Sequence, residues 1–248
     1  MFIETALKNI CLNIIVTELD SDRIDVLYGK GVYSYRNCPI TWNNRKKEKA
    51  QKDLLNVQCK IHSEISNNYD KNPKIKHFCD SLTYDYIPLW AIFEILTLGE
   101  FGRLIGILIF DLKDKISNKF EIGISFDTNR DLLERYIMIL KYLRNSVAHN
   151  NIVYDNRFKS SNEPNSVYTF LSNEIGLPYV NFKDIIDYVA LIVFFLKKLD
   201  IAKKNIKDFV KSFEKATEEY CSNMDPSITS ITINSNWRMR IQIIKKYI

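Results

Sequence analysis

The chain has 248 residues, 46% of them hydrophobic, with only seven glycines and six prolines. This composition excludes a disordered or low-complexity chain, and the length suffices to bury a core without disulfides or metals. The formal net charge of +5 permits nucleic-acid binding but does not require it.

The sequence also bears on location and redox state. The first 20 residues do not resemble a secretion signal, because acids come early and no basic segment precedes a long apolar stretch. The most apolar run, residues 189–196, is far shorter than the roughly 20 residues that a membrane span needs. Five cysteines without a Cys-x-x-Cys pair, and three histidines, supply a zinc site poorly. We therefore expect a cytoplasmic protein with reduced thiols, no membrane contact, no metal and no cofactor.

Apolar residues recur at helical spacing along most of the chain. Residues 28–42 interrupt this pattern with glycines and a proline, and they are predicted to be loop or short strand. Residues 155–180 are predicted to be an exposed connection with a hairpin-like excursion at residues 167–171. Helices are predicted, in chain order, over residues 2–19, 45–68, 89–98, 101–112, 129–149, 182–200 and 203–221, with a short final helix around 237–244.

Residues that start and stop helices refine these limits. Asn44 is predicted to cap the helix over 45–68. Pro88 suits the first turn of the next helix, and Gly99 is predicted to end it. The helix over 101–112 is either separate or continuous with its predecessor around a kink.

The pattern as a whole predicts an all-α fold of six to eight helices. We see no internal repeat and no linker that divides the chain, so a single domain is expected over residues 1–248. Residues 1–45 are expected to form an N-terminal appendage to it.

A basic cluster lies at the start of the predicted helix over 45–68. Helix starts favour acids, because the dipole is positive there, so basic residues call for another explanation such as phosphate contact. A solvated face is the alternative, and the sequence leaves both open. The candidate RNA-binding residues of this cluster are Arg45, Lys46, Lys47 and Lys49.

The helix over 129–149 carries the candidate chemistry. Its predicted core stripe consists of Leu132, Leu133, Tyr136, Ile137, Leu140, Leu143 and Val147. Near its end come Arg144, Asn145 and His149, in the pattern R-N-x-x-x-H. Asn145 and His149 are spaced i, i+4 and share a helix face, whereas Arg144 lies about 140° from His149 on an ideal helix.

These residue types suit RNA cleavage without a metal, in which the 2′-OH of RNA is the nucleophile. Imidazole can take or supply a proton near neutral pH. Guanidinium offers fixed donors to the phosphate as its charge grows. The alternative is structural: such a spacing arises by chance in many helices, and His149 would then cap a helix end.

Two segments resemble the Abi family of bacterial abortive-infection proteins. Residues 87–102, with a Pro-Leu-Trp entry and one acid in an apolar helix, resemble its first block. Residues 144–158, with Arg-Asn and then Ala-His, resemble its second block, and R-N-x-x-x-H is the motif form of HEPN ribonucleases. The resemblance covers residues 75–158 well and 180–245 loosely.

The resemblance implies a HEPN-like helical bundle, with a core over residues 75–221 and extra N- and C-terminal helices. It implies RNA cleavage in phage defence by a homodimer that joins two motifs, and some relatives act beside a small noncoding RNA. A non-catalytic RNA-binding or interaction module is the alternative, and a nucleotide-modified antitoxin-type partner is a third. Many family members carry a second His directly after the motif His, and here that position is Asn150. Which residue acts as the general base is therefore left open.

Other residues are given roles around this motif. Asn150, Tyr154 and Arg157 follow it and are predicted to contact RNA. Glu94 is a lone acid in an apolar helix, so it is expected to be buried and paired with Arg144 or Arg103. Trp90 is expected to be structural, and His62 and His77 are expected at the surface.

Overall fold

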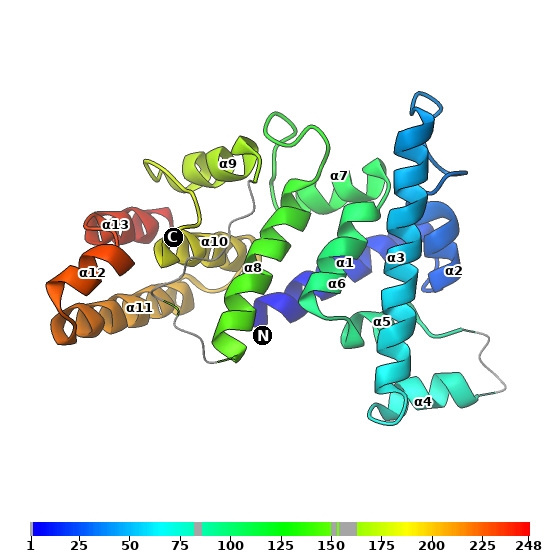
Figure 1. Ribbon diagram of the computed structural model, residues 1–248, viewed down its shortest axis with the longest axis horizontal. Helices are drawn as coiled ribbons and strands as arrows, with labels where there is room; N and C mark the ends of the chain where they lie inside the picture. Colours follow the sequence, from blue (N-terminus) through cyan, green and yellow to red (C-terminus); the bar gives the residue numbers. More distant parts are fainter. Residues whose placement is uncertain (1, 82–85, 150–152, 154–162) are drawn as a thin grey trace. The chain divides into compact units, whose positions relative to one another are not determined.

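The computed structural model describes residues 2–81, 86–149, 153 and 163–248. Within these residues it contains thirteen α-helices and one π-helix and no strand, so the predicted all-α class is confirmed (Figure 1). The number of helices exceeds the predicted six to eight, because several predicted connections are short helices.

The chain divides into two compact units. The first comprises Met1–Lys119 and Asn129–Glu134, and the second comprises Phe120–Thr128 and Arg135–Ile248. Single-domain organisation, with a core over residues 75–221, stays a prediction.

Eight helices of the described residues lie within the first unit. They are α1 (Phe2–Leu19), α2 (Ile24–Val26), the π-helix η1 (Leu27–Gly31), α3 (Asn44–Asn68), α4 (Pro73–Asp80), α5 (Leu89–Ile95), α6 (Leu98–Ile107) and α7 (Phe110–Lys119). The long helix α3 crosses α5 and α6 (Figure 1).

Helix α1 is part of the core of this unit. Its Leu7, Cys11 and Ile15 are fully buried, and the helix packs against α7, α5 and η1. Residues 1–45 are therefore not an appendage to the first unit. The sequence did not reveal this, because α1 is apolar on more than one face and its partners lie far along the chain.

Two predicted helix ends are corrected. Asn43, not Asn44, caps α3, since its side chain accepts a hydrogen bond from the N–H of Lys46 at 2.9 Å. Gly99 does not end a helix and is buried inside α6. Helix α5 ends before Gly99, at Ile95, and Thr97 and Glu100 form a capping box at the start of the next helix, α6.

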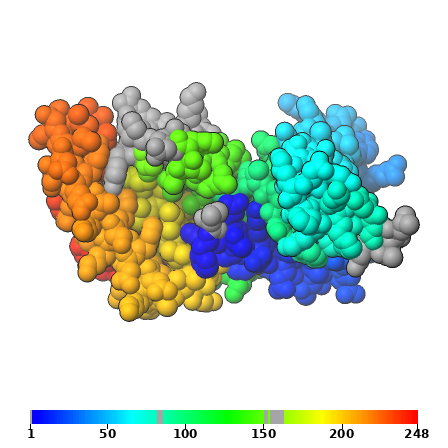
Figure 2. All heavy atoms as spheres, turned by 90° about the horizontal axis from the view of Figure 1, so that it is seen from below, coloured from blue at the N-terminus to red at the C-terminus, as the bar shows by residue number. Residues whose placement is uncertain are grey.

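Helix α8 (Leu132–Ala148) begins with residues of the first unit and continues in the second. The other helices of the second unit are α9 (Asn165–Ile175), α10 (Ile185–Lys198), α11 (Lys203–Asn223), α12 (Pro226–Thr232) and α13 (Trp237–Tyr247). α10 forms the centre of this unit, in contact with α9, α11 and α13. Figure 2 shows α11, in orange, along the surface, in agreement with its few buried residues.

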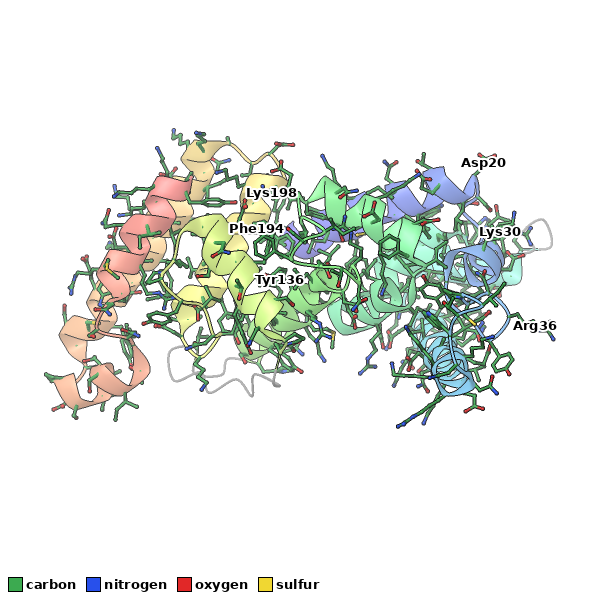
Figure 3. All side chains as sticks on the ribbon, turned by 90° about the horizontal axis from the view of Figure 1, so that it is seen from above. Asp20, Lys30, Arg36, Tyr136, Phe194 and Lys198 are labelled. Atoms are coloured by element: carbon green, nitrogen blue, oxygen red, sulfur yellow. The ribbon has the colours of Figure 1, made fainter. Side chains whose placement is uncertain are left out.

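Aromatic rings and one ionic cluster fill the core of the second unit. The Tyr136 ring lies 6.4 Å from Phe194 of α10, and Figure 3 labels both, with Lys198 at the end of the same helix. The guanidinium of Arg240 is fully buried and pairs with Asp187, which is also fully buried, and with Asp184 at 3.3 Å.

The predicted hairpin-like excursion at residues 167–171 is wrong. These residues belong to α9, whose Val167, Phe170 and Leu171 are buried. Gly176 ends the helix with a left-handed φ of 82°, which glycine adopts without strain. Burial of the apolar face overrides the strand preference of β-branched and aromatic residues.

Candidate active site

The start of α8 is fixed by a buried arginine. Arg130 has a left-handed φ of 58° and is only 4% exposed. Its Nε donates to Asp114 at 2.7 Å and its Nη2 donates to Asn118 at 3.1 Å, both on α7. These bonds hold a backbone conformation that is unfavourable for a non-glycine residue, and so they set where α8 begins.

The first half of α8 is packed and its last two turns are not. Leu132, Leu133, Tyr136, Ile137, Ile139 and Leu140 are buried. The Tyr136 hydroxyl donates to the carbonyl of Val167 at 2.7 Å. None of residues 141–149, all of which the structure describes, is buried.

The predicted core stripe is therefore wrong at its end. Val147 is 61% exposed and Leu143 is only half-buried. Helical spacing identifies an apolar face, but it does not reveal whether another element covers that face. The motif lies on this uncovered end of the helix.

Arg144 and His149 are exposed, and Asn145 between them is half-buried. The Asn145 side-chain carbonyl accepts a hydrogen bond from Nη1 of Arg144 at 3.2 Å. The N–H of His149 donates to the main-chain carbonyl of Asn145 at 2.9 Å. This bond continues the helical turn past Ala148, so the i, i+4 relation of Asn145 and His149 is kept.

Sequence reasoning missed Tyr142 as a site residue. It precedes His149 by seven positions, which is about two helical turns, so both share a face with Asn145. The Tyr142 ring is 37% exposed and carries Lys141 Nζ 5.3 Å from its centroid. The i, i+3, i+7 spacing was the available signal. An exposed ring on the same helix face as the motif can stack on an RNA base.

The basic cluster lies in the first unit, at the first two turns of α3. Arg45, Lys46 and Lys49 are exposed, and Lys47 is half-buried. Lys49 forms an ion pair with Asp53 at 3.0 Å, whereas Lys46 lies over the Trp42 ring at 4.1 Å. The motif at the end of α8 belongs to the second unit. RNA contact by these four residues stays a prediction.

The remaining predicted RNA contacts cannot be placed. Asn150, Tyr154 and Arg157 lie outside the described residues. Their assignment stays a prediction from the sequence.

The prediction that Glu94 is buried and paired with Arg103 or Arg144 is wrong. Its side chain is 46% exposed, and its carboxylate pairs with Lys74 of α4 at 2.8 Å rather than with Arg103 or Arg144. Trp90, one turn earlier, is 41% exposed and meets Phe78 of α4 edge-on at 5.6 Å. The acid is tolerated in this apolar helix because it lies at the solvent-facing edge.

The other two histidines are exposed, as predicted for His62 and His77. Among the described residues, no three His, Cys, Asp or Glu side chains gather as metal ligands would. No helix in the described part of the chain has the length and apolar character to cross a bilayer.

Comparison with known families adds the decisive observation: residues 1–155 match the Abi-like proteins. The chain belongs to this family. The predicted Abi resemblance is confirmed, and membership supports an abortive-infection-type function. The matched residues of this Abi-like protein run from α1 through the motif at the end of α8, so α9–α13 lie outside them. No curated protein and no solved structure matches the chain.

Proposed function

We propose that this Abi-like protein is a metal-independent endoribonuclease of the HEPN type that acts on RNA in the cytoplasm during abortive infection. One observation carries the proposal: Arg144, Asn145 and His149 lie at an uncovered helix end, and none of the three is buried. The motif residues are therefore available to a substrate.

The chemistry follows from the residue types. The 2′-oxygen of RNA attacks the adjacent phosphorus and loses its proton to a base, while the bond to the 5′-oxygen breaks and that oxygen gains a proton. His149 serves as base or acid in this exchange. Arg144 stabilises the charge that grows on the phosphate oxygens. The products are a 2′,3′-cyclic phosphate and a 5′-hydroxyl.

We further propose that two chains form the complete site. A general acid and a general base are two groups, and one chain supplies a single motif histidine. Arg144 and His149 also point about 140° apart on an ideal helix. A two-fold interface would place two copies of the α8 end opposite each other. Exposure of Tyr142 and Val147 beside the motif supports this arrangement, because both would gain from burial.

The cleavage proposal is tested with purified chain and total RNA in EDTA. We expect cleavage to persist and to leave 2′,3′-cyclic phosphate ends or their opened products. His149→Ala should abolish it, whereas His62→Ala, which changes another exposed histidine, on α3, should not. Strict magnesium dependence or 5′-phosphate products would overturn the mechanism. RNA binding without any cleavage would favour a non-catalytic RNA-binding module.

The shared site is tested by mixing chains. Excess His149→Ala chain should suppress wild-type activity if each site draws on two chains, and light scattering should report twice 29.2 kDa. Activity that stays proportional to the wild-type chain, together with a mass of one chain, would refute the two-chain site.

A further inference from the structure

The first unit contains a cavity of about 430 Å³ between the loop before α3, the first turns of α3 and the α6–α7 junction. Its wall includes Tyr33, Trp42, Lys46, Lys49 and Lys113. All of its lining residues are described and belong to one unit. This volume is within the range of pockets that hold small ligands.

One wall is a fixed aromatic pair. The ring centroids of Tyr33 and Trp42 lie 4.8 Å apart. The N–H of Tyr33 donates to the carbonyl of Ile107, and its hydroxyl accepts from the N–H of Phe110, both at 3.0 Å. Bonds at both ends of the tyrosine hold its ring in place. Every nucleobase has a π-face, so such a wall suits a base of any sequence.

The charged groups of the cavity favour an anion. Lys49 and Lys113 pair with Asp53 and Asp131 at 3.0 and 2.8 Å, and all four residues line the cavity. Lys46 is the third lysine, and among the described residues it forms no ion pair. Its ammonium rests 4.1 Å from the centre of the Trp42 ring. The cavity thus has one cation in excess, beside the aromatic wall.

A second hollow, of about 320 Å³, adjoins the first and shares Tyr33 and Phe110 with it. It adds the exposed cation Arg36, labelled in Figure 3, the carboxylate of Asp111, and Asn37, whose side-chain NH2 donates to the carbonyl of Val32 at 3.1 Å. The two hollows share a tyrosine ring and each contains a cation, and aromatic rings and cations are the groups that proteins use to bind single-stranded nucleic acids. We call the two together the Tyr33 groove.

We propose that the Tyr33 groove binds single-stranded RNA, with one nucleotide in each hollow, a base against Tyr33 and Trp42, and a phosphate at Lys46. The choice of RNA rests on the proposed function. The groove belongs to the first unit and the motif to the second, so the groove would be a further RNA-binding site of this chain.

The test measures binding of a fluorescent single-stranded RNA dodecamer to the full chain carrying His149→Ala. Trp42→Leu in this background should weaken binding about tenfold, the typical loss of one stacked base. Lys46→Gln should lower the salt slope of the binding constant by about 0.7, the value for one phosphate of a single strand. Lys60→Gln, which changes an exposed lysine on α3 outside the groove, should alter neither quantity.

Three outcomes decide the proposal. Binding by Trp42→Leu and Lys46→Gln that equals the Lys60→Gln control overturns it. Free uridine 5′-monophosphate that competes as well as the dodecamer, nucleotide for nucleotide, also overturns it, because the groove would then be a mononucleotide pocket. Losses confined to the groove variants support it, even where the wild-type chain cleaves nothing and the proposed ribonuclease activity fails.

Discussion

Replacing Arg240 with Met should strongly destabilise the second unit. The Asp187 carboxylate is fully buried, and it accepts hydrogen bonds from Arg240 and from the N–H groups of Asn181 and Phe182 at 2.9 and 2.8 Å. Removing one partner of a buried ion pair typically costs about 3–5 kcal/mol. Two backbone donors remain on Asp187, so we expect the lower end, about 3 kcal/mol.

The assay is urea unfolding followed by circular dichroism. With a slope of about 2 kcal/mol per molar urea, the midpoint should fall by about 1.5 M. Arg238→Met is the matched control, because Arg238 lies on the same helix but is exposed over the Trp237 ring. It should cost less than about 1 kcal/mol. An Arg240→Met variant as stable as this control would refute the reasoning.

The pH dependence of the Arg240→Met deficit gives an independent check. Burial raises the pKa of Asp187, and the charge of Arg240 opposes that rise. Without Arg240 the folded-state pKa should rise further above the unfolded value of about 3.9. Protonated Asp187 is then favoured in the folded state, so stability is present at low pH and lost as pH rises through the folded pKa. The deficit should therefore shrink as pH falls toward 4, and Asp187→Asn should relieve part of it at pH 7.

Two further predictions concern the first unit. In η1, a Cβ at Gly31 would lie 2.6 Å from a methyl carbon of Leu27, so Gly31→Ala should cost about 1–3 kcal/mol in urea unfolding. Gly29→Ala meets nothing within 4 Å and should stabilise by about 0.5 kcal/mol; equal effects of the two would contradict this packing. Burial raises the pKa of the Cys11 thiol, whereas Cys59 is exposed. Thiol labelling at pH 8 should therefore modify Cys59 in the folded chain and Cys11 only after unfolding, and rapid labelling of Cys11 would show that α1 is not packed as described.

The sequence predicts long helices well where apolar residues recur at helical spacing over several turns. The helix predicted over 45–68 is α3, with its start displaced by one residue, and the helix predicted over 2–19 is α1. Periodicity and capping are local properties, so they can be read from neighbouring residues. The boundary between α5 and α6 also has a local sequence signal, the Thr-x-x-Glu capping box that begins at Thr97. Apolar residues continue on both sides of it, so the apolar pattern alone does not show the boundary.

Features that depend on distant partners were not predictable. Val147 lies on the apolar stripe of α8, yet whether it is buried depends on elements elsewhere in the chain. Glu94 is predicted to be buried and paired with Arg103 or Arg144, because the sequence does not show that α4 places Lys74 beside it.

The same distinction separates the two candidate sites. Arg144, Asn145 and His149 lie within two turns of one helix, so their relative positions follow from sequence spacing alone. The Tyr33 groove joins the loop before α3 to Lys113 of α7 and to residues just before α8. A site assembled from such separated segments leaves no contiguous motif to recognise.

Helix α8 has a packed first half and an uncovered end, so under the proposed function the number of residues between the two parts matters. One residue inserted after Leu140 would leave the packed half untouched, yet it would turn Tyr142, Asn145 and His149 together by about 100° around the helix axis. Insertion of four residues would return them to within about 40° of their original direction, displaced by about 6 Å along the axis. Under the proposed function, the direction in which the motif side chains leave the helix is therefore constrained by the substrate that they must face.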